Sequence, residues 1–278
     1  MPVGARGATS ASAFNLALFR ISLSAMVLLS PEIRTAAAWA QLPRSLFVVP
    51  EGLGWFVAHV PITPTIARVA SYLFVAGALC ALAGWRTRLA LAVVTGAGFY
   101  ILALPQLSGS VNHNMHFLWF SALLAASPSG DAWSIDAWRA GRGWKSPEGP
   151  QYAWPIDVAC LLFGAIYFFP GFWKLATSGL DWIWSDNLRN HMYWKWFESG
   201  WTPAFRIDRH PLLCRLGAAA VVAFELTFPC LVLRRSLRPI AAVGGVAFHL
   251  ATEWIVRIPF FGLWGLYLVL LDGRRIAN

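Results

Sequence analysis

Long apolar runs with almost no charged residues dominate the sequence, and they constrain the fold more than any other feature. A helix needs about 20 apolar residues to cross a bilayer, and it must satisfy its own backbone hydrogen bonds there. The sequence therefore predicts an all-α integral membrane protein, a polytopic bundle of about seven or eight transmembrane helices with interfacial Trp-rich segments. The apolar runs are Phe14–Leu29, Thr65–Gly84, Leu89–Leu107, Val111–Ala126, Ala153–Leu175, Leu212–Leu233, Pro239–Val256 and Phe260–Leu271.

Composition agrees with a membrane protein and excludes several other classes. The chain is 58% hydrophobic and 13% charged, whereas soluble domains average about 25% charged residues. We expect a single transmembrane domain over residues 1–278, with its core at about 14–271 and no extramembrane substrate-binding domain. The net charge of +9 comes from short basic clusters between the runs, so it does not indicate a nucleic-acid surface. The expected surroundings are a lipid bilayer.

The basic clusters predict the orientation of the chain in its membrane. If the eight runs alternate, the clusters fall on one side, which the positive-inside rule assigns to the cytoplasm. We therefore expect an inner or cytoplasmic membrane protein with a cytoplasmic N-terminus. The clusters are Arg86 and Arg88, then Arg139, Arg142 and Lys145, then Arg234, Arg235 and Arg238, and finally Arg274 and Arg275.

Ionisable residues inside the runs are the candidate functional groups, because a charge in hydrocarbon is costly unless it is paired or faces a cavity. On the predicted topology most of them lie toward the outer face, the periplasm or a lumen, and a cavity open to that side would accommodate them. His249 lies about two turns deeper than Arg257 on one helical face. The set is Arg20, His113, His116, Lys174, Glu225, His249, Glu253 and Arg257.

For several of these residues the sequence leaves alternatives open. Arg20 and Glu225 lie at similar depth and would satisfy each other as a buried structural ion pair. His113 and His116 are either interfacial imidazoles bonded to loop carbonyls or functional groups, and without a third ligand nearby no metal site is predicted. Lys174 either extends to the interface at a helix end or, in a dry pocket, loses its proton and acts as a general base.

Several short motifs follow one another along the chain, at intervals that resemble those of the vitamin K-dependent gamma-carboxylase family. The membrane part of that family occurs in bacterial proteins as the horizontally transferred transmembrane (HTTM) domain. The resemblance covers about Phe14 to Leu271, with Trp173 in place of the first lysine of a family lysine pair and Glu225 in place of an Asp. The motifs are Asn15-Leu16-Ala17-Leu18-Phe19-Arg20, Gly77-Ala78-Leu79 with Gly84 and Arg88, Asn112-His113 with Trp133-Ser134-Ile135-Asp136, Gly171-Phe172-Trp173-Lys174-Leu175 with Asp181-Trp182, and Glu225 with Arg238, Phe248-His249 and Ile258-Pro259-Phe260-Phe261.

The resemblance implies a chemistry and assigns residues to it. Lys174 matches the family's catalytic base, which deprotonates a reduced naphthoquinone, and the quinone then reacts with O2 so that CO2 can add to a substrate glutamate. His113 would hydrogen-bond the quinone oxygen as a second catalytic residue. The residues expected to help bind the quinone cofactor are Asn112, Trp173, His249 and Glu253.

Three functional hypotheses follow and stay open on the sequence alone. In the first, the protein is an enzyme that uses a reduced quinone and O2 to modify a secreted peptide or small molecule on the outer face. The animal carboxylase carries a large lumenal domain for its substrate, so here we expect a partner protein to capture the substrate, or a different substrate. In the second hypothesis the chain is a non-catalytic integral subunit of a membrane complex. In the third it is a maturation factor for an exported peptide toxin.

Overall fold

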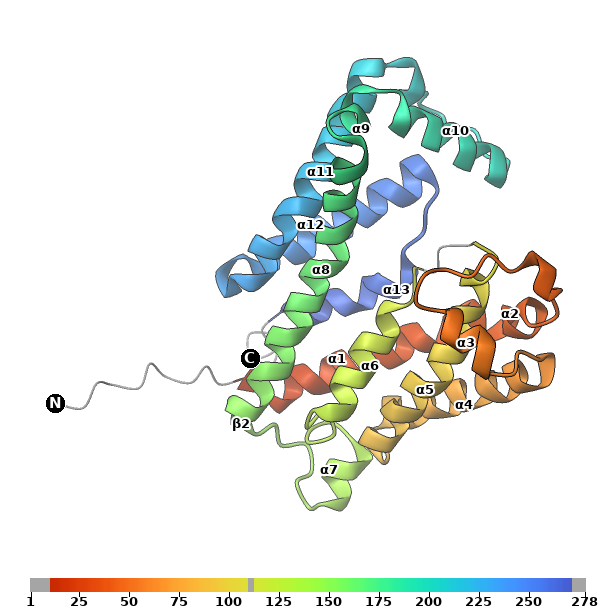
Figure 1. Cartoon of the computed structure of the whole chain (residues 1–278). Helices are drawn as coiled ribbons and strands as arrows, with labels where there is room; N and C mark the ends of the chain where they lie inside the picture. The colour runs from red at the N-terminus through yellow and green to blue at the C-terminus, as the bar shows by residue number, and fades with distance from the viewer. Residues whose placement is uncertain (1–10, 110–112, 272–278) are drawn as a thin grey trace. The chain divides into compact units, whose positions relative to one another are not determined.

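The computed structural model describes residues 11–109 and 113–271, and these form two compact units (Figure 1). Unit 1 contains the described residues up to Ile156, and unit 2 contains Asp157–Leu271. Helices make up nearly all of the regular structure in both units.

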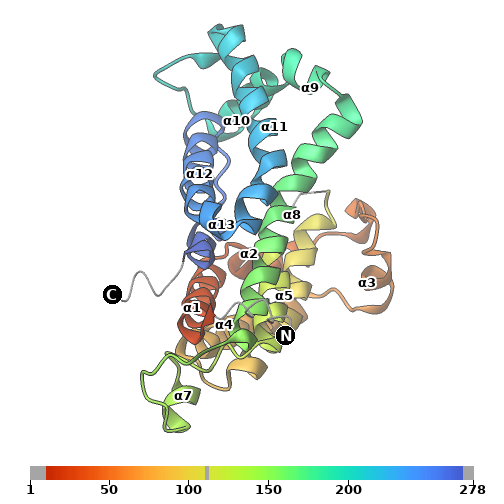
Figure 2. The ribbon, with the colours of Figure 1, turned by 90° about the vertical axis from the view of Figure 1, so that its left-hand side faces the viewer.

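Unit 1 contains two long antiparallel helices, α4 and α5, with α1 and α6 packed against them (Figures 1 and 2). The axis bends by 46° between α1 and α2, and the two short strands pair antiparallel. In chain order the elements are β1 (Ala11–Ser12), α1 (Ala13–Leu28), α2 (Glu32–Trp39), η1 (Arg44–Leu46), α3 (Gly54–His59), α4 (Pro64–Ala83), α5 (Thr87–Gln106), α6 (His116–Ala126), α7 (Ile135–Arg139), β2 (Glu148–Gly149) and η2 (Pro150–Tyr152).

Unit 2 is built on three apolar helices, α8, α11 and α12, with shorter helices between them. Helix α8 begins in the last residues of unit 1 and continues through unit 2. The elements are α8 (Ala153–Ser178), α9 (Asp181–Trp184), α10 (Asn187–Ser199), η3 (Ile207–Arg209), α11 (Pro211–Leu233), η4 (Arg235–Leu237), α12 (Arg238–Ala251), the π-helical turn η5 (Thr252–Val256), α13 (Phe261–Trp264) and η6 (Gly265–Leu270).

The ends of α4 follow directly from its sequence. Thr63 caps the first turn by accepting a hydrogen bond from the amide of Ile66, and Pro64 occupies a position that needs no amide donor. At the other end Gly84 has φ of 69°, a conformation that L side chains rarely adopt. A Cβ at Gly84 would also overlap Ser134, so both the backbone and the packing require glycine there.

Arg20 joins α1 to the segment before α7. Its side chain is fully buried, and its guanidinium donates to the carbonyls of Ser129 at 2.7 Å, Ala132 at 3.4 Å and Trp133. A guanidinium offers several donors in a rigid plane, which suits it to a group of main-chain oxygens that lack helical partners. Two motif segments, one in α1 and one around Trp133, are therefore in direct contact.

Asp136 holds the start of α5. Its carboxylate accepts hydrogen bonds from the amides of Arg86 and Thr87, at 2.9 and 2.8 Å, and from the Thr87 hydroxyl at 2.8 Å. Its own amide donates to the carbonyl of Gly84. Asp136 thus satisfies amides at a helix N-terminus from a distant part of the chain, as an N-cap residue would locally.

In unit 2, α8 and α11 lie side by side in both views (Figures 1 and 2). Gly164 and Gly171 on α8 bring the backbones close, since a Cβ at Gly164 would lie 3.2 Å from the Cα of Pro229 and one at Gly171 would lie 2.8 Å from the Cβ of Glu225. Small residues that permit such approach are typical of helix pairs in membranes.

The predicted all-α membrane fold is confirmed, and the structure refines the number of spans. Among the described residues five helices are long and apolar enough to cross a membrane, or six if the bent α1–α2 pair counts as one span. The predicted runs Val111–Ala126 and Phe260–Leu271 give only the shorter apolar helices His116–Ala126 and Phe261–Leu270. Arg257, with φ of 61°, and Pro259 separate the last two runs into distinct helices.

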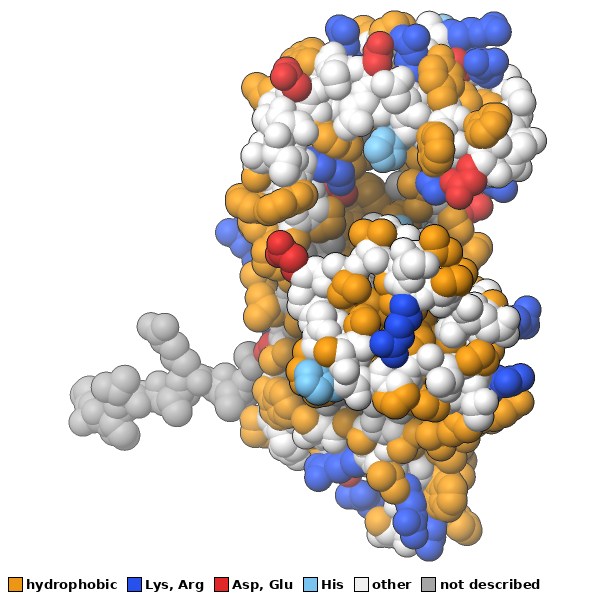
Figure 3. Space-filling view, turned by 45° about the vertical axis from the view of Figure 1, so that its right-hand side comes forward, with side chains coloured by type: hydrophobic (Ala, Val, Ile, Leu, Met, Phe, Trp, Pro, Cys, Tyr) orange, Lys and Arg blue, Asp and Glu red, His pale blue; other side chains and the backbone are white. Residues whose placement is uncertain are grey.

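The surface agrees with a membrane environment. Hydrophobic side chains cover much of the face shown in Figure 3, and many large apolar residues are exposed, including Tyr72, Val243 and Trp254. Large exposed apolar side chains in this number agree with a surface that faces lipid rather than water.

The Asp136 contacts predict a loss of stability in acid. Burial raises the pKa of Asp136, but the hydrogen bonds from Thr87 and Arg86 and the charge of Arg20 outweigh it and hold the pKa below its usual range. The contribution to stability is therefore complete above the unfolded pKa of about 4 and is lost as the pH falls through the folded value. We expect Asp136→Asn to cost about 1–2 kcal/mol at pH 7 and to flatten the decline of the apparent Tm below about pH 4.

The measurement is thermal unfolding of the detergent-purified protein between pH 3 and pH 7. Glu51→Gln is the control, because Glu51 is an exposed carboxylate in a turn of the same unit. Equal acid sensitivity of the parent and Asp136→Asn would contradict the assignment.

Candidate functional site

Lys174 lies near the end of α8 and forms an ion pair with Glu225 of α11. Its Nζ donates to both carboxylate oxygens at 2.6 Å. The side chain of Glu225 is only 7% exposed and that of Lys174 is 23% exposed. The ring of Trp182 lies 5.1 Å from the Lys174 Nζ, close enough for a cation–π interaction. The candidate base is thus a half-buried ammonium held by one carboxylate and one indole.

The predicted ion pair between Arg20 and Glu225 is wrong. Glu225 is bonded to Lys174, and Arg20 is bonded to main-chain carbonyls of unit 1. The two charges lie at similar depth in their apolar runs, but depth does not distinguish a carboxylate from main-chain carbonyls as the partner of an arginine, or an arginine from a helix-end lysine as the partner of a glutamate. Both charges are still satisfied, as the cost of burying them requires.

A second polar cluster, which is buried, surrounds His249 in the same unit. The Tyr167 hydroxyl is 2.9 Å from the Nε2 of His249 and also contacts the hydroxyl of Tyr267. The three side chains come from α8, α12 and η6, and all are buried. His249 is an ionisable residue within an apolar run and so stands out in the sequence, whereas a tyrosine in such a run cannot be told from other aromatic residues there.

Aromatic rings of α11 connect the two clusters. Phe224 and Phe228 lie one residue before and three residues after Glu225, and both rings pack against Tyr167, with centroid distances of 5.5 and 4.0 Å. On α8, Tyr167, Gly171 and Lys174 follow at helical intervals and so share one face. The His249 cluster and the Lys174–Glu225 pair therefore lie along the same α8–α11 interface.

An apolar cavity of about 320 Å³ lies between α10, α11, α12 and η5. Phe224 and Phe248 both line it, and their rings stack at 5.3 Å. Glu225 and His249 directly follow these two phenylalanines in the sequence. The other lining residues are Leu188, Met192, Ile207, Leu213, Gly217, Ala220, Val221, Gly244, Ala251, Thr252, Ile255 and Val256.

Glu253 and Arg257 form an ion pair, with 3.3 Å between Oε1 and Nη1. His249, Glu253 and Arg257 were predicted to share one face of a continuous α-helix. The helix is not continuous, because α12 ends at Ala251 and a π-helical turn follows. The Arg257 guanidinium also lies 5.2 Å from the ring of Trp201. Contact of Glu253 with a cofactor stays a prediction.

The structure shows no hydrogen bond, ion pair or ring contact of the remaining predicted site residues with the Lys174–Glu225 pair among the residues that it describes. His113 is exposed in the turn before α6, in unit 1, and its carbonyl oxygen lies 2.8 Å from the Nδ1 of His116. Asn112 lies outside the described residues. Trp173 precedes Lys174 on α8 with its side chain 66% exposed. Their catalytic or cofactor-binding roles stay predictions.

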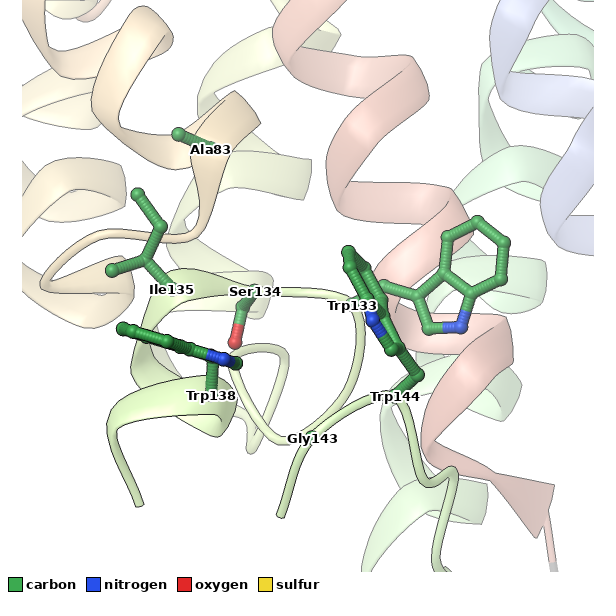
Figure 4. A pocket seen from close by; sticks show the side chains of 7 residues that line it. All are labelled: Ala83, Trp133, Ser134, Ile135, Trp138, Gly143 and Trp144. Carbon is green, nitrogen blue, oxygen red and sulfur yellow. The ribbon is translucent and has the colours of Figure 1, made fainter. Parts of the chain in front are cut away.

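A second cavity, of about 400 Å³, lies beside α7 in unit 1. Three tryptophans, Trp133, Trp138 and Trp144, surround it (Figure 4). The hydroxyl of Ser134, which also lines it, donates to the Gly130 carbonyl and accepts from the Ala137 amide. The Ser134 hydroxyl is already hydrogen-bonded, and the walls of the cavity are aromatic. The cavity therefore resembles part of an interfacial tryptophan belt more than a catalytic site.

Comparison with known proteins places the chain in a family. Residues 9–271 match the HTTM domain, which covers nearly the whole chain and both units. The chain belongs to the HTTM domain family. This membership agrees with the resemblance to vitamin K-dependent gamma-carboxylases and with a membrane protein. Comparisons with curated proteins and with solved structures found no match.

The close approach of α11 to Gly171 predicts that alanine at this position lowers the stability of the protein, although alanine ordinarily stabilises a helix relative to glycine. Gly171→Ala would place a methyl group against Glu225, so we expect a loss of about 1–3 kcal/mol and displacement of the carboxylate from Lys174. The control is Gly96→Ala on α5, because a Cβ there meets nothing within 4 Å and alanine favours a helix. Apparent Tm values should therefore move in opposite directions. A Gly171→Ala protein as stable as Gly96→Ala would show that the contact is not needed.

Proposed function

We propose that this protein is a membrane enzyme in which Lys174 acts as a base on a reduced quinone, in a reaction that uses O2 to modify a secreted peptide or small molecule. The observation that most supports it is the Lys174–Glu225 pair, a lysine and a carboxylate in contact at 2.6 Å between two apolar helices. Membership of the HTTM domain family supports it independently.

The pair offers Lys174 a route to the neutral amine that a base requires. In a dry environment charged forms are disfavoured, so a proton can pass from the Nζ of Lys174 to the adjacent Glu225 carboxylate. The neutral amine then accepts a proton from the substrate hydroxyl: an N–H bond forms, the O–H bond breaks, and its electron pair stays on oxygen. Trp182 restricts water on one side of the amine.

The apolar cavity suits the body of a naphthoquinone, because its walls are aliphatic and aromatic and Phe224 and Phe248 present stacked rings. A bound quinol would supply the acidic hydroxyl and, with O2, would end as the quinone epoxide and water, driving removal of a proton from a carbon acid to which CO2 can add. Tyr167 and His249, buried behind these phenylalanines, would fix the orientation of the rings.

A non-catalytic role has one observation in its favour. Glu225 engages Lys174 through both oxygens, as an ion pair that serves only to join α8 to α11 would do. The protein would then be an integral subunit of a membrane complex. A role as maturation factor for an exported peptide toxin is the third candidate, and in it the site would face the outer side of the membrane.

Removal of the lysine distinguishes these functions. We expect Lys174→Ala to lower epoxide formation from a reduced naphthoquinone by about 10²–10⁴-fold, because a positioned base contributes that much. The assay is aerobic incubation with the purified protein, followed by mass spectrometry of the quinone. Lys195→Ala is the matched control, since Lys195 also forms an ion pair, with Glu198 on exposed α10 of the same unit.

The folded state of each variant is checked by apparent Tm and size-exclusion chromatography. Full epoxide formation by Lys174→Ala would overturn the role of Lys174. Absence of epoxide from the parent, with no quenching of tryptophan fluorescence by the quinone, would favour the membrane-subunit role.

A further inference from the structure

A groove in unit 1 combines apolar walls with two arginines, Arg34 and Arg68. It has a volume of about 520 Å³ and lies between α2 and α4. Its α4 side is a single helical stripe that begins at Arg68 and ends at Leu79, about 16 Å farther along the axis at 1.5 Å per residue. Arg34 of α2 also lines it. The remaining lining residues are Ile33, Ala37, Ser71, Tyr72, Val75 and Ala76.

The charge of these two arginines is not compensated. Within residues 11–109 and 113–271, neither Arg34 nor Arg68 forms an ion pair. The acidic residue nearest in sequence, Glu32, is buried and accepts hydrogen bonds from Ser30 and from Asn114. Arg68 lies in the second turn of α4, near the start of an apolar span, and its side chain is exposed.

The groove meets the requirements of one kind of ligand. An anion bound by Arg34 and Arg68 would compensate their positive charges. The apolar stripe beyond Arg68 would bind a hydrocarbon chain. Ser71 does not compete for the ligand, since its hydroxyl donates to the Ala67 carbonyl. The Tyr72 side chain is largely exposed and lies one helical turn after Arg68 on α4, and tyrosine is a residue type that favours the membrane–water interface.

We propose that this groove binds one anionic phospholipid, with the phosphate between Arg34 and Arg68 and an acyl chain along Tyr72, Val75, Ala76 and Leu79. The lipid completes the packing between α2 and α4 and neutralises the arginines. The groove shares no lining residue with the proposed catalytic site, and the lipid proposal does not rest on that function.

The test measures retained lipid by native mass spectrometry, using full-length protein in detergent supplied with phosphatidylglycerol or phosphatidylcholine. The Arg34→Gln/Arg68→Gln variant should bind phosphatidylglycerol about tenfold more weakly or worse, as expected for two interfacial cations. The control is Arg215→Gln, because Arg215 is likewise exposed near the start of an apolar span, α11, and lines neither this groove nor the apolar cavity of unit 2.

A second variant tests the groove without changing charge. Ala76→Trp fills the groove at an exposed position and should displace the lipid while both arginines remain. Preference for phosphatidylglycerol that is lost in both variants and kept in Arg215→Gln would support the proposal. Equal retention of the two lipids would overturn the proposal, and so would phosphatidylglycerol binding that neither variant changes. Binding of glycerol 3-phosphate as tight as that of phosphatidylglycerol would also overturn it.

Discussion

A charged side chain inside hydrocarbon must find its partners within the protein, and this constraint organises both units. Arg20 meets it with the carbonyls of Ser129 and Trp133, and Lys174 meets it with the carboxylate of Glu225. The two solutions differ in consequence. Carbonyl oxygens cannot accept the proton of an arginine, so Arg20 is purely structural, whereas a carboxylate can exchange a proton with a lysine. The same physical requirement thus produces a connection to main-chain carbonyls in unit 1 and, in unit 2, the ion pair to which we assign proton transfer.

Glycines make both solutions sterically feasible. Gly84 lets the end of α4 approach Ser134 beside the Arg20 guanidinium, and Gly171 lets Glu225 approach α8 one turn before Lys174. Without a strong hydrophobic force between helices in lipid, close packing and polar contacts supply the association. The glycines beside Arg20 and Glu225 are therefore part of the geometry on which these contacts depend.

The sequence predicted the long helices well and the contacts between them poorly. Helix α4 could be placed from Thr63, Pro64 and Gly84, since caps and hydropathy act locally. The partner of Glu225 could not, because several cations lie at similar depth and only the packing of α8 on α11 selects Lys174. Tyr167 and Tyr267 were missed for the same reason. The Tyr167 hydroxyl meets His249 and the Tyr267 hydroxyl only when residues separated by most of unit 2 pack together.

The sequence by itself determined that this is an α-helical membrane protein, which motifs it carries and which residues bear charge in its apolar runs. Those properties follow from the transfer of each segment from water to hydrocarbon, which depends on local composition. The tertiary structure alone decided which charges meet, that the motif around Trp133 binds Arg20, and that Arg34 and Arg68 pair with no acidic residue in the part of the chain that the structure describes. Pairing between distant segments depends on helix packing at the level of single Cβ atoms, and no local pattern encodes that geometry.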